Sequence, residues 1–414
     1  MQKLPEFRSF LELVMGIQEP WHITGLNVDT ENCQIDIDID FMTGAAFTCP
    51  KCGQDECSVH DTRDKRWRHL NLFQYKVYVH ARVPRIRCPQ DGTHQVLLPW
   101  AREGSGFTLL FESLVMELAQ VMPVKAMADM LGEHDTRLWR IINHHIAEAV
   151  NSQDLSNLES VGVDETARRK GHRYITSFID LKTCAPVFVT EGKGKGTLKE
   201  FLEFIKSHGG APSKIKDFSC DMSPAFIAGI GEYFPCARIT FDKFHVIKMM
   251  NEALDNVRRK EQKEFEELKG SRWLWLRKEK NLKQSQKEKL NKLIGSKAAP
   301  QTTKAYGISQ SLKRVYSSNE AEWAELALKG WYRWASHSRL KPVVEFARTV
   351  KEHWNGIINY FHSRWTNSIL EALNSLFKAF SARARGYRTV RNAISAFYLA
   401  CGKLKFDLPR LTPE

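Results

Sequence analysis

Two short apolar runs that each end in an aspartate constrain the fold of this 414-residue chain more than any other feature. Residues 161–164 have the sequence VGVD and residues 218–221 have the sequence FSCD. Such a run is typical of a buried strand that delivers a carboxylate at its end. A third motif, residues 366–374 (TNSILEALN), has the spacing of an amphipathic helix with Glu371 on its polar face. Hard divalent cations bind carboxylate oxygens, so the three motifs together predict a metal site.

The residues between the two aspartates predict a layered α/β domain. Strands are expected over 160–164, 174–181 and 185–190, followed by a helix over 197–207 with a capping-box pattern at its start. A strand, a helix and a strand follow over residues 215–241. This order is that of an RNase H-like fold, in which the first and fourth strands are neighbours. We therefore expect the two aspartates to lie side by side, although they are 57 positions apart (221 − 164).

Other acidic residues compete for these roles. Glu165 follows the first aspartate and, because side chains alternate along a strand, is expected on the opposite face of the sheet. Asp180 and Asp217 are expected to be solvated residues at strand ends. Asp242 lies at the start of the helix after the fifth strand. Together with His245, it is predicted to orient the metal-binding residues without binding the metal itself. A lone histidine is more commonly structural, and this alternative stays open for His245.

The positive charge of the chain predicts a polyanionic partner. The formal net charge is +13 and the isoelectric point is about 9.2. Residues 251–314 carry 17 Lys and Arg against 8 Asp and Glu, and residues 364–405 carry 8 against 1. A merely basic soluble protein and a membrane-surface binder are alternatives. Residues predicted to contact DNA phosphates flank the acidic motifs and occupy the first basic stretch: Arg168, Arg169, Lys170, Arg258, Arg259, Lys260, Arg383, Arg385 and Arg388.

A Cys-x-x-Cys pair near the N-terminus predicts a zinc site. Cys49, Cys52 and Cys88 supply three ligands, and the residues between the pair and Cys88 alternate as in a zinc ribbon. The fourth ligand is expected to be His94, with Cys57 or His60 as alternatives. If zinc has been lost, the cysteine pair is part of a small core instead. Nine cysteines without a disulfide-like framework favour a reducing cytoplasm.

Residues 124–143 have the pattern of a helix-turn-helix unit, with Gly132 at the turn. Such a unit places its second helix in the DNA major groove, where Arg137 and Arg140 are the basic candidates. A plain helical hairpin fits the pattern nearly as well. The chain has no apolar run of the ~18 residues that a spanning helix requires, and its start lacks a signal-peptide pattern.

The combined motifs resemble those of transposases of the bacterial ISL-three family of insertion sequences. The resemblance rests on VGVDE at 161–165, CDMSP at 220–224, FDKFHV at 241–246 and the motif at 366–374, and it extends from about residue 50 to about residue 404. It implies cut-and-paste DNA transposition by an Asp-Asp-Glu triad that binds Mg²⁺ or Mn²⁺. By position, the triad is Asp164, Asp221 and Glu371. Joining two transposon ends implies a homodimer in the active complex, bound to terminal inverted repeats and target DNA.

The expected architecture is a multidomain α/β chain in six segments. These are an N-terminal segment (1–46), a zinc-ribbon-like module (47–105), a helix-turn-helix module (106–152), the first part of an RNase H-like core (158–250), a helical insertion (251–355) and the last part of the core (356–406). The insertion is expected to form a lid that contacts DNA phosphates; its alternative is a solvated helical module with a tryptophan core. Two other functions stay open, a DNA-binding regulator that no longer cuts and an RNase H-like nuclease without strand transfer.

Overall fold

The computed structural model describes residues 5–169, 173–277, 281–296 and 299–411. These residues form two compact units, one of Met1–His145 with Lys405–Glu414 and one of Ile146–Leu404. Within the described ranges, no helix combines the length and apolarity that crossing a bilayer demands.

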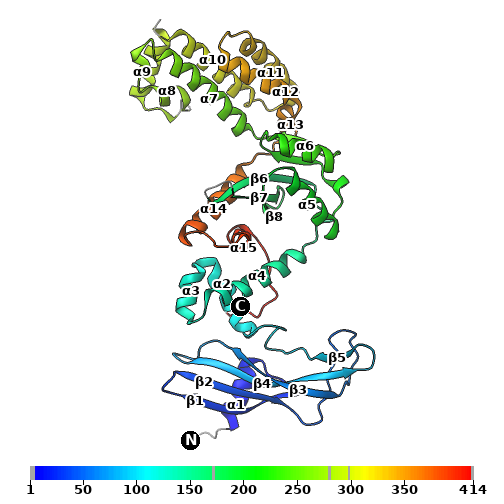
Figure 1. Cartoon of the computed structure of the whole chain (residues 1–414). Helices are drawn as coiled ribbons and strands as arrows, with labels where there is room; N and C mark the ends of the chain where they lie inside the picture. Colours follow the sequence, from blue (N-terminus) through cyan, green and yellow to red (C-terminus); the bar gives the residue numbers. More distant parts are fainter. Residues whose placement is uncertain (1–4, 170–172, 278–280, 297–298, 412–414) are drawn as a thin grey trace. The chain divides into compact units, whose positions relative to one another are not determined.

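The first unit is built on a five-stranded sheet. Strands β1 (Trp21–Asp29), β2 (Gln34–Phe41), β4 (Lys76–Cys88) and β3 (Val59–Arg68) are neighbours in that order, and β5 (Gly92–Gln95) also pairs with β4 (Figure 1). Strand β2 alternates isoleucine and aspartate, so its isoleucines enter the core and its aspartates face solvent. The predicted boundary at residue 46 therefore separates strands that belong to one sheet. Helix α1 (Pro5–Met15) packs on β1.

Three helices follow the sheet in the chain: α2 (Leu109–Val121), α3 (Val124–Leu131) and α4 (Asp135–Asn151). Helices α3 and α4 have the predicted helix-turn-helix arrangement. Gly132 caps the C-terminus of α3 at a φ of +64°, a left-handed conformation that only glycine adopts without strain. Leu138 and Ile141 of α4 are buried, as the apolar spacing predicts.

The second unit contains a mixed sheet with the strand order β10-β9-β6-β7-β8. These strands are β6 (Ser160–Arg169), β7 (Arg173–Asp180), β8 (Ala185–Glu191), β9 (Asp217–Cys220) and β10 (Arg238–Phe241). Strand β6 pairs antiparallel with β7 and parallel with β9, which confirms that the first and fourth strands are neighbours. Strand β6 runs five residues beyond Asp164, so the prediction that it ends there is wrong. The helices between these strands are α5 (Lys195–Ser207), the short η1 (Pro212–Lys214) and α6 (Pro224–Tyr233).

A helical region follows the last strand. Helix α7 (Lys243–Glu261) packs against α10 (Pro300–Val315) and α12 (Lys341–Glu352), and α11 (Ala321–Ser336) lies against α10 and α12. The shorter elements η2 (Glu266–Leu268), α8 (Arg272–Leu276) and α9 (Gln284–Gly295) lie between α7 and α10 in the chain. Trp275 and Trp331 are buried in the core of this region, whereas Trp273, Trp323 and Trp334 are exposed. The expectation that the tryptophans form the core of this region therefore holds for Trp275 and Trp331 and fails for the other three.

The chain then returns to the sheet. Helix α13 (Trp354–Ser363) packs against β10, α14 (Ser368–Arg383) against β6, and α15 (Val390–Cys401) against α14 and β8. Figure 1 shows α14 and α15 near the sheet although they lie far from it in the sequence. On β6, Val161 and Val163 are fully buried in the core that includes Phe201 of α5, and the intervening Gly162 faces Leu370 of α14. Asp164 is thus on the α14 face of the sheet.

Candidate functional site

The parallel pairing of β6 with β9 ends close to both predicted aspartates. Gly162 of β6 is registered with Ser219 of β9 in the last pair of this parallel ladder. Asp164 and Asp221 each lie two residues beyond that pair. The charge of Asp221 raises the pKa of Asp164, which is consistent with two neighbouring carboxylates. Both side chains are half-buried.

Asp164 is held in place by two hydrogen bonds. Its Oδ2 accepts from Nδ2 of Asn374 on α14 at 2.8 Å, and its Oδ1 accepts from the backbone N–H of Glu165 at 2.8 Å. Burial raises the pKa of Asp164 to about 6, and the charge of Asp221 adds to this effect. A carboxyl group with a raised pKa is protonated more readily than a free one, and a bound cation would favour its ionised form. This donor set therefore fits a divalent cation.

Glu371 lies on the first turn of α14, three residues before Asn374, so both project from the same side of the helix. Its side chain is exposed. Among the described residues, the carboxylate oxygens of the triad do not all lie within 4.8 Å of one another. Asp164 lies close enough to Asp221 to respond to its charge. The helix that carries Glu371 contacts Asp164 through the hydrogen bond from Asn374. The sequence motif contained Asn374 on the polar face, but only the tertiary contact indicates its role.

The start of α14 is fixed by a residue of β9 and by the residue that follows β10. Oδ1 of Asn367 accepts a hydrogen bond from the hydroxyl of Ser219 at 2.6 Å, and its backbone N–H donates to Oδ1 of Asp242 at 3.3 Å. Asp242 is fully buried and lies at the N-terminus of α7. His245 is half-exposed, with its Nδ1 4.0 Å from Oδ2 of Asp242. This arrangement supports Asp242 as a residue that orients the site. Sequence reasoning gave no role to Asn367.

Glu165 lies on the opposite face of β6 from Asp164, as strand alternation predicts, although Asp221 is the charge that acts on it most strongly. Its surroundings include Lys193 and the backbone of Gly194 at the start of α5. Burial raises the pKa of Glu165, and the charge of Asp221 adds to the shift while Lys193 opposes it. Glu165 is therefore a useful control position, because it carries the same charge next to Asp164 but on the other face.

The residues predicted to contact DNA phosphates differ in their exposure. Arg383, Arg385 and Arg388 are exposed at or after the end of α14. Arg168 is half-buried and donates from its guanidinium to the backbone carbonyl of Tyr387 at 3.4 Å. Arg169 belongs to β6, and Lys170 lies outside the described residues.

The prediction that Arg258 contacts DNA is wrong, because its side chain is only 6% exposed. Its guanidinium pairs with Asp255 at 2.8 Å and bonds Gln262. Arg259 and Lys260, in contrast, are exposed on α7.

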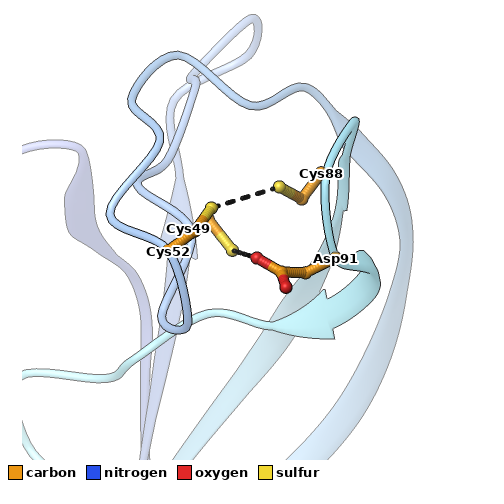
Figure 2. A group of neighbouring side chains, drawn as sticks. All are labelled: Cys49, Cys52, Cys88 and Asp91. Atoms are coloured by element: carbon orange, nitrogen blue, oxygen red, sulfur yellow. Dashed lines mark hydrogen bonds between the residues drawn. The ribbon is translucent and has the colours of Figure 1, made fainter.

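Three cysteines and one aspartate gather at one end of the first unit's sheet (Figure 2). Ligand atoms of Cys49, Cys52, Cys88 and Asp91 all lie within 4.8 Å of one another. The sulfurs of Cys52 and Cys88 are 3.5 Å apart, and Sγ of Cys49 is 4.0 Å from a carboxylate oxygen of Asp91. A tetrahedral zinc with Zn–S bonds of 2.3 Å separates its sulfurs by about 3.8 Å, so the spacing suits this metal.

The charges of this cluster also fit a cation. The Asp91 carboxylate raises the pKa of the Cys52 thiol to about 12. Backbone N–H groups at Asp91 and Gln90 lower the pKa of Cys88. The Asp91 carboxylate therefore opposes ionisation of the neighbouring Cys52 thiol. A divalent cation bound between the two groups would offset this repulsion. Among the described residues, this is the cluster that contains the predicted cysteines.

The fourth position of the cluster differs from the prediction. His94 is half-buried, and its ring Nε2 lies 2.8 Å from the backbone carbonyl of Asp91 instead of joining the thiols. The alternatives are not members of this group of four: the Cys57 thiol donates to the carbonyl of Gln54 at 3.4 Å, although it also interacts with Cys88, and His60 lies beside Asp61. The carboxylate of Asp91 occupies the place predicted for His94.

The two arginines predicted on the second helix of the helix-turn-helix unit differ in their surroundings. Arg140 is exposed on α4. Arg137 pairs with the buried Glu133, and its guanidinium lies 4.3 Å from the ring centroid of Phe107. Arg137 is therefore engaged within the unit, and Arg140 is the more accessible of the two.

Comparison with known proteins gives matches along most of the chain. Residues 161–397 match a family model described as "Transposase", residues 96–146 match "Helix-turn-helix domain of transposase family ISL3", and residues 45–91 match "zinc-finger of transposase IS204/IS1001/IS1096/IS1165". The chain is 30% identical over 357 residues to the transposase for insertion sequence element IS1001 of Bordetella parapertussis, covering 84% of this chain and 86% of that protein. It is 26% identical over 396 residues to the transposase for insertion sequence element IS1557 of Mycobacterium tuberculosis, covering 87% of each.

Proposed function

Since the chain belongs to the ISL3 family of insertion-sequence transposases, we propose that it cuts and joins DNA with Asp164, Asp221 and Glu371 as its catalytic triad. The observation that carries this proposal is the hydrogen bond from Asn374 to Asp164. This hydrogen bond joins the motif that contains Asp164 to the helix that carries Glu371. The pairing of β6 with β9 brings the motif that contains Asp221 close to the motif that contains Asp164. The strand order supports an RNase H-like core, with the helical region after α7 as an insertion before Glu371.

In this proposal the three carboxylates hold Mg²⁺ or Mn²⁺. When bound, such ions supply positive charge at the reacting phosphate and acidify the attacking water. Asn374 orients the Asp164 carboxylate, and Asn367 fixes the start of the helix that carries Glu371. The reaction is hydrolysis of a phosphodiester bond at the transposon end. The freed 3′-hydroxyl then attacks a phosphodiester of target DNA, and no covalent protein–DNA bond forms.

The remaining parts of the chain would recognise and hold the DNA. The helix-turn-helix unit places α4 in the major groove, with Arg140 available to the bases or the backbone. Exposed Arg383, Arg385 and Arg388, at and beyond the far end of the helix that carries Glu371, hold DNA phosphates. Since two transposon ends must be joined, the active complex contains two copies of the chain bound to terminal inverted repeats.

The experiment that tests the function is incubation of the purified full chain with labelled duplex DNA taken from the sequence flanking its gene. We expect nicking at the boundary of an inverted repeat in the presence of Mg²⁺ or Mn²⁺, and none after chelation. A chain that binds this DNA but never cuts it with either metal would instead be a regulator.

We also propose that zinc is bound by Cys49, Cys52, Cys88 and Asp91, which yields a prediction with a matched control. Asp91→Ala and Cys52→Ser should each lower the zinc content measured by elemental analysis well below one ion per chain, since each removes a ligand. His94→Ala should retain zinc, because His94 lies outside the cluster. Zinc loss in His94→Ala together with full retention in Asp91→Ala would reverse the assignment.

A further inference from the structure

A groove runs along the exposed side of helix α7 in the second unit. Two hollows, of about 680 and 450 Å³, share Asn256 and Arg259 in their lining. The α7 residues that line them recur every three or four positions from Phe244 to Lys260, and Lys263 follows just beyond the helix. This spacing is that of one helix face. The hollows are therefore two parts of one groove, which begins two residues after Asp242.

The groove is rich in cations. Six basic side chains line it against three acidic ones, so its formal charge is +3: Lys248, Arg259, Lys260, Lys263, Arg272 and Lys341 against Glu252, Asp255 and Glu345. All six basic residues are exposed, whereas Asp255 is buried. The six basic side chains are therefore accessible to a ligand, whereas the carboxylate of Asp255 is not.

Asp255 holds three arginines at the centre of this groove. Its carboxylate is 2.8 Å from Arg258, 3.0 Å from Arg259 and 3.2 Å from Arg272. Asp255 is 5% exposed, but the side chains of Arg259 and Arg272 are 61% and 47% exposed. Arg258 is buried and serves the fold, so the other two form the accessible pair.

This geometry prepares the two exposed guanidinium groups for an anion. A guanidinium has five N–H donors, and pairing with one carboxylate leaves several of them available. Arg259 comes from α7 and Arg272 from α8, so the shared carboxylate fixes two otherwise flexible side chains relative to each other. Their loss of side-chain freedom on binding is thereby reduced.

We propose that Arg259 and Arg272, held by Asp255, form a phosphate-binding fork that grips the backbone of duplex DNA along α7. From Lys248 to Lys260 the helical rise spans about 18 Å, a length over which each strand of a duplex presents about five phosphates. The lining has cations at both ends of this length and Arg272 at its centre, which matches an extended polyanion better than a compact anion. The inference rests on the proposed function, which supplies DNA as the partner.

Neutralising the fork should weaken binding and flatten its salt dependence. Arg259→Gln and Arg272→Gln should each lower the affinity for duplex DNA of arbitrary sequence about tenfold at low salt. Each should reduce the slope of log affinity against log salt concentration by about 0.9, the value for one lost phosphate contact. Arg333→Gln and Arg348→Gln are matched controls, because both arginines are exposed in the same helical region but line neither hollow. Equal slopes in fork and control variants would overturn the proposal.

The Asp255→Asn variant distinguishes two explanations, a fork whose arginines are held in place and a surface that is only basic. Removal of a negative charge should strengthen DNA binding if net charge alone matters. The fork predicts the opposite, a severalfold weaker affinity, because Arg259 and Arg272 lose their common anchor. Since this variant leaves Arg258 buried without its partner, its melting temperature is measured as well. If it unfolds, the Asp255→Asn/Arg258→Met double variant replaces it, and stronger binding than wild type in a folded variant refutes the fork.

All binding measurements are made without divalent metal, so the outcome does not depend on cleavage. A failed cleavage assay together with normal fork effects would contradict only the proposed triad. Normal cleavage together with unchanged binding in Arg259→Gln and Arg272→Gln would contradict only the fork.

Discussion

Asp164→Asn, Asp221→Asn and Glu371→Gln should each reduce DNA cleavage by about three orders of magnitude or more. Each amide keeps the size of the side chain but removes the negative charge that a metal ligand supplies, and this charge stabilisation is worth several kcal/mol. The measurement is single-turnover cleavage of labelled end DNA with saturating Mg²⁺ or Mn²⁺. DNA affinity should change little, because the predicted binding surfaces lie elsewhere on the chain.

Glu165→Gln is the matched control for these variants. It removes the same charge next to Asp164, but Glu165 lies on the opposite face of β6, where Lys193 and the Gly194 backbone oppose the effect of the Asp221 charge. Cleavage by this variant should stay within about tenfold of wild type, as for a residue that contacts no ligand. Equal losses in Glu165→Gln and Asp164→Asn would show that the assay reports the fold rather than the triad.

Gly162→Ala should reduce cleavage about a hundredfold while leaving DNA binding intact. A Cβ at this position would lie 2.6 Å from Cδ1 of Leu370 and 2.9 Å from Cδ2 of Leu181. Leu370 is buried and immediately precedes Glu371, so any shift of α14 that relieves this clash moves the glutamate with it. A displacement of about 1 Å in a catalytic group can cost about 100-fold in rate. Overpacking of this kind also costs about 1–3 kcal/mol of stability, which thermal unfolding measures.

Two further variants make this test specific. Gly231→Ala is the control, because Gly231 is exposed on α6 and a Cβ there meets nothing within 4 Å. It should leave cleavage unchanged. Leu370→Val in the Gly162→Ala background removes bulk where the clash arises, so it should restore part of the activity. A Gly162→Ala variant with wild-type cleavage would mean that contact between β6 and α14 does not position Glu371.

The order of the strands in the second unit could be predicted because each buried strand is a short apolar run with a clear end. The extent of β6 could not. Residues 165–169 (ETARR) are polar, so the apolar signal stops at Asp164, whereas backbone pairing with β7 continues to Arg169. The capping box expected at Thr197 is also wrong. Helix α5 already begins at Lys195, and the Thr197 hydroxyl bonds the carbonyl of Gly194 inside the first turn.

The binding residues show why sequence position alone is insufficient. Arg258, Arg259 and Lys260 form one basic cluster in the sequence, but three consecutive residues of a helix span about 200° and cannot all lie on one face. Arg258 consequently points into the core. At the cysteine cluster, the choice between Asp91 and His94 depends on the turn at Gly92, which has a φ of +85°. Histidine is a commoner zinc ligand than aspartate, so ligand preference favoured His94 and the geometry favours Asp91.

Mn²⁺ binding by the full chain tests most directly whether the three acidic motifs form a single metal site. Binding can be followed by the loss of the electron paramagnetic resonance signal of free Mn²⁺, with and without duplex DNA. The wild type and Glu165→Gln should bind Mn²⁺ alike, and Asp164→Asn, Asp221→Asn and Glu371→Gln should each bind it at least tenfold more weakly. Wild-type Mn²⁺ affinity in all three triad variants, with and without DNA, would contradict the account.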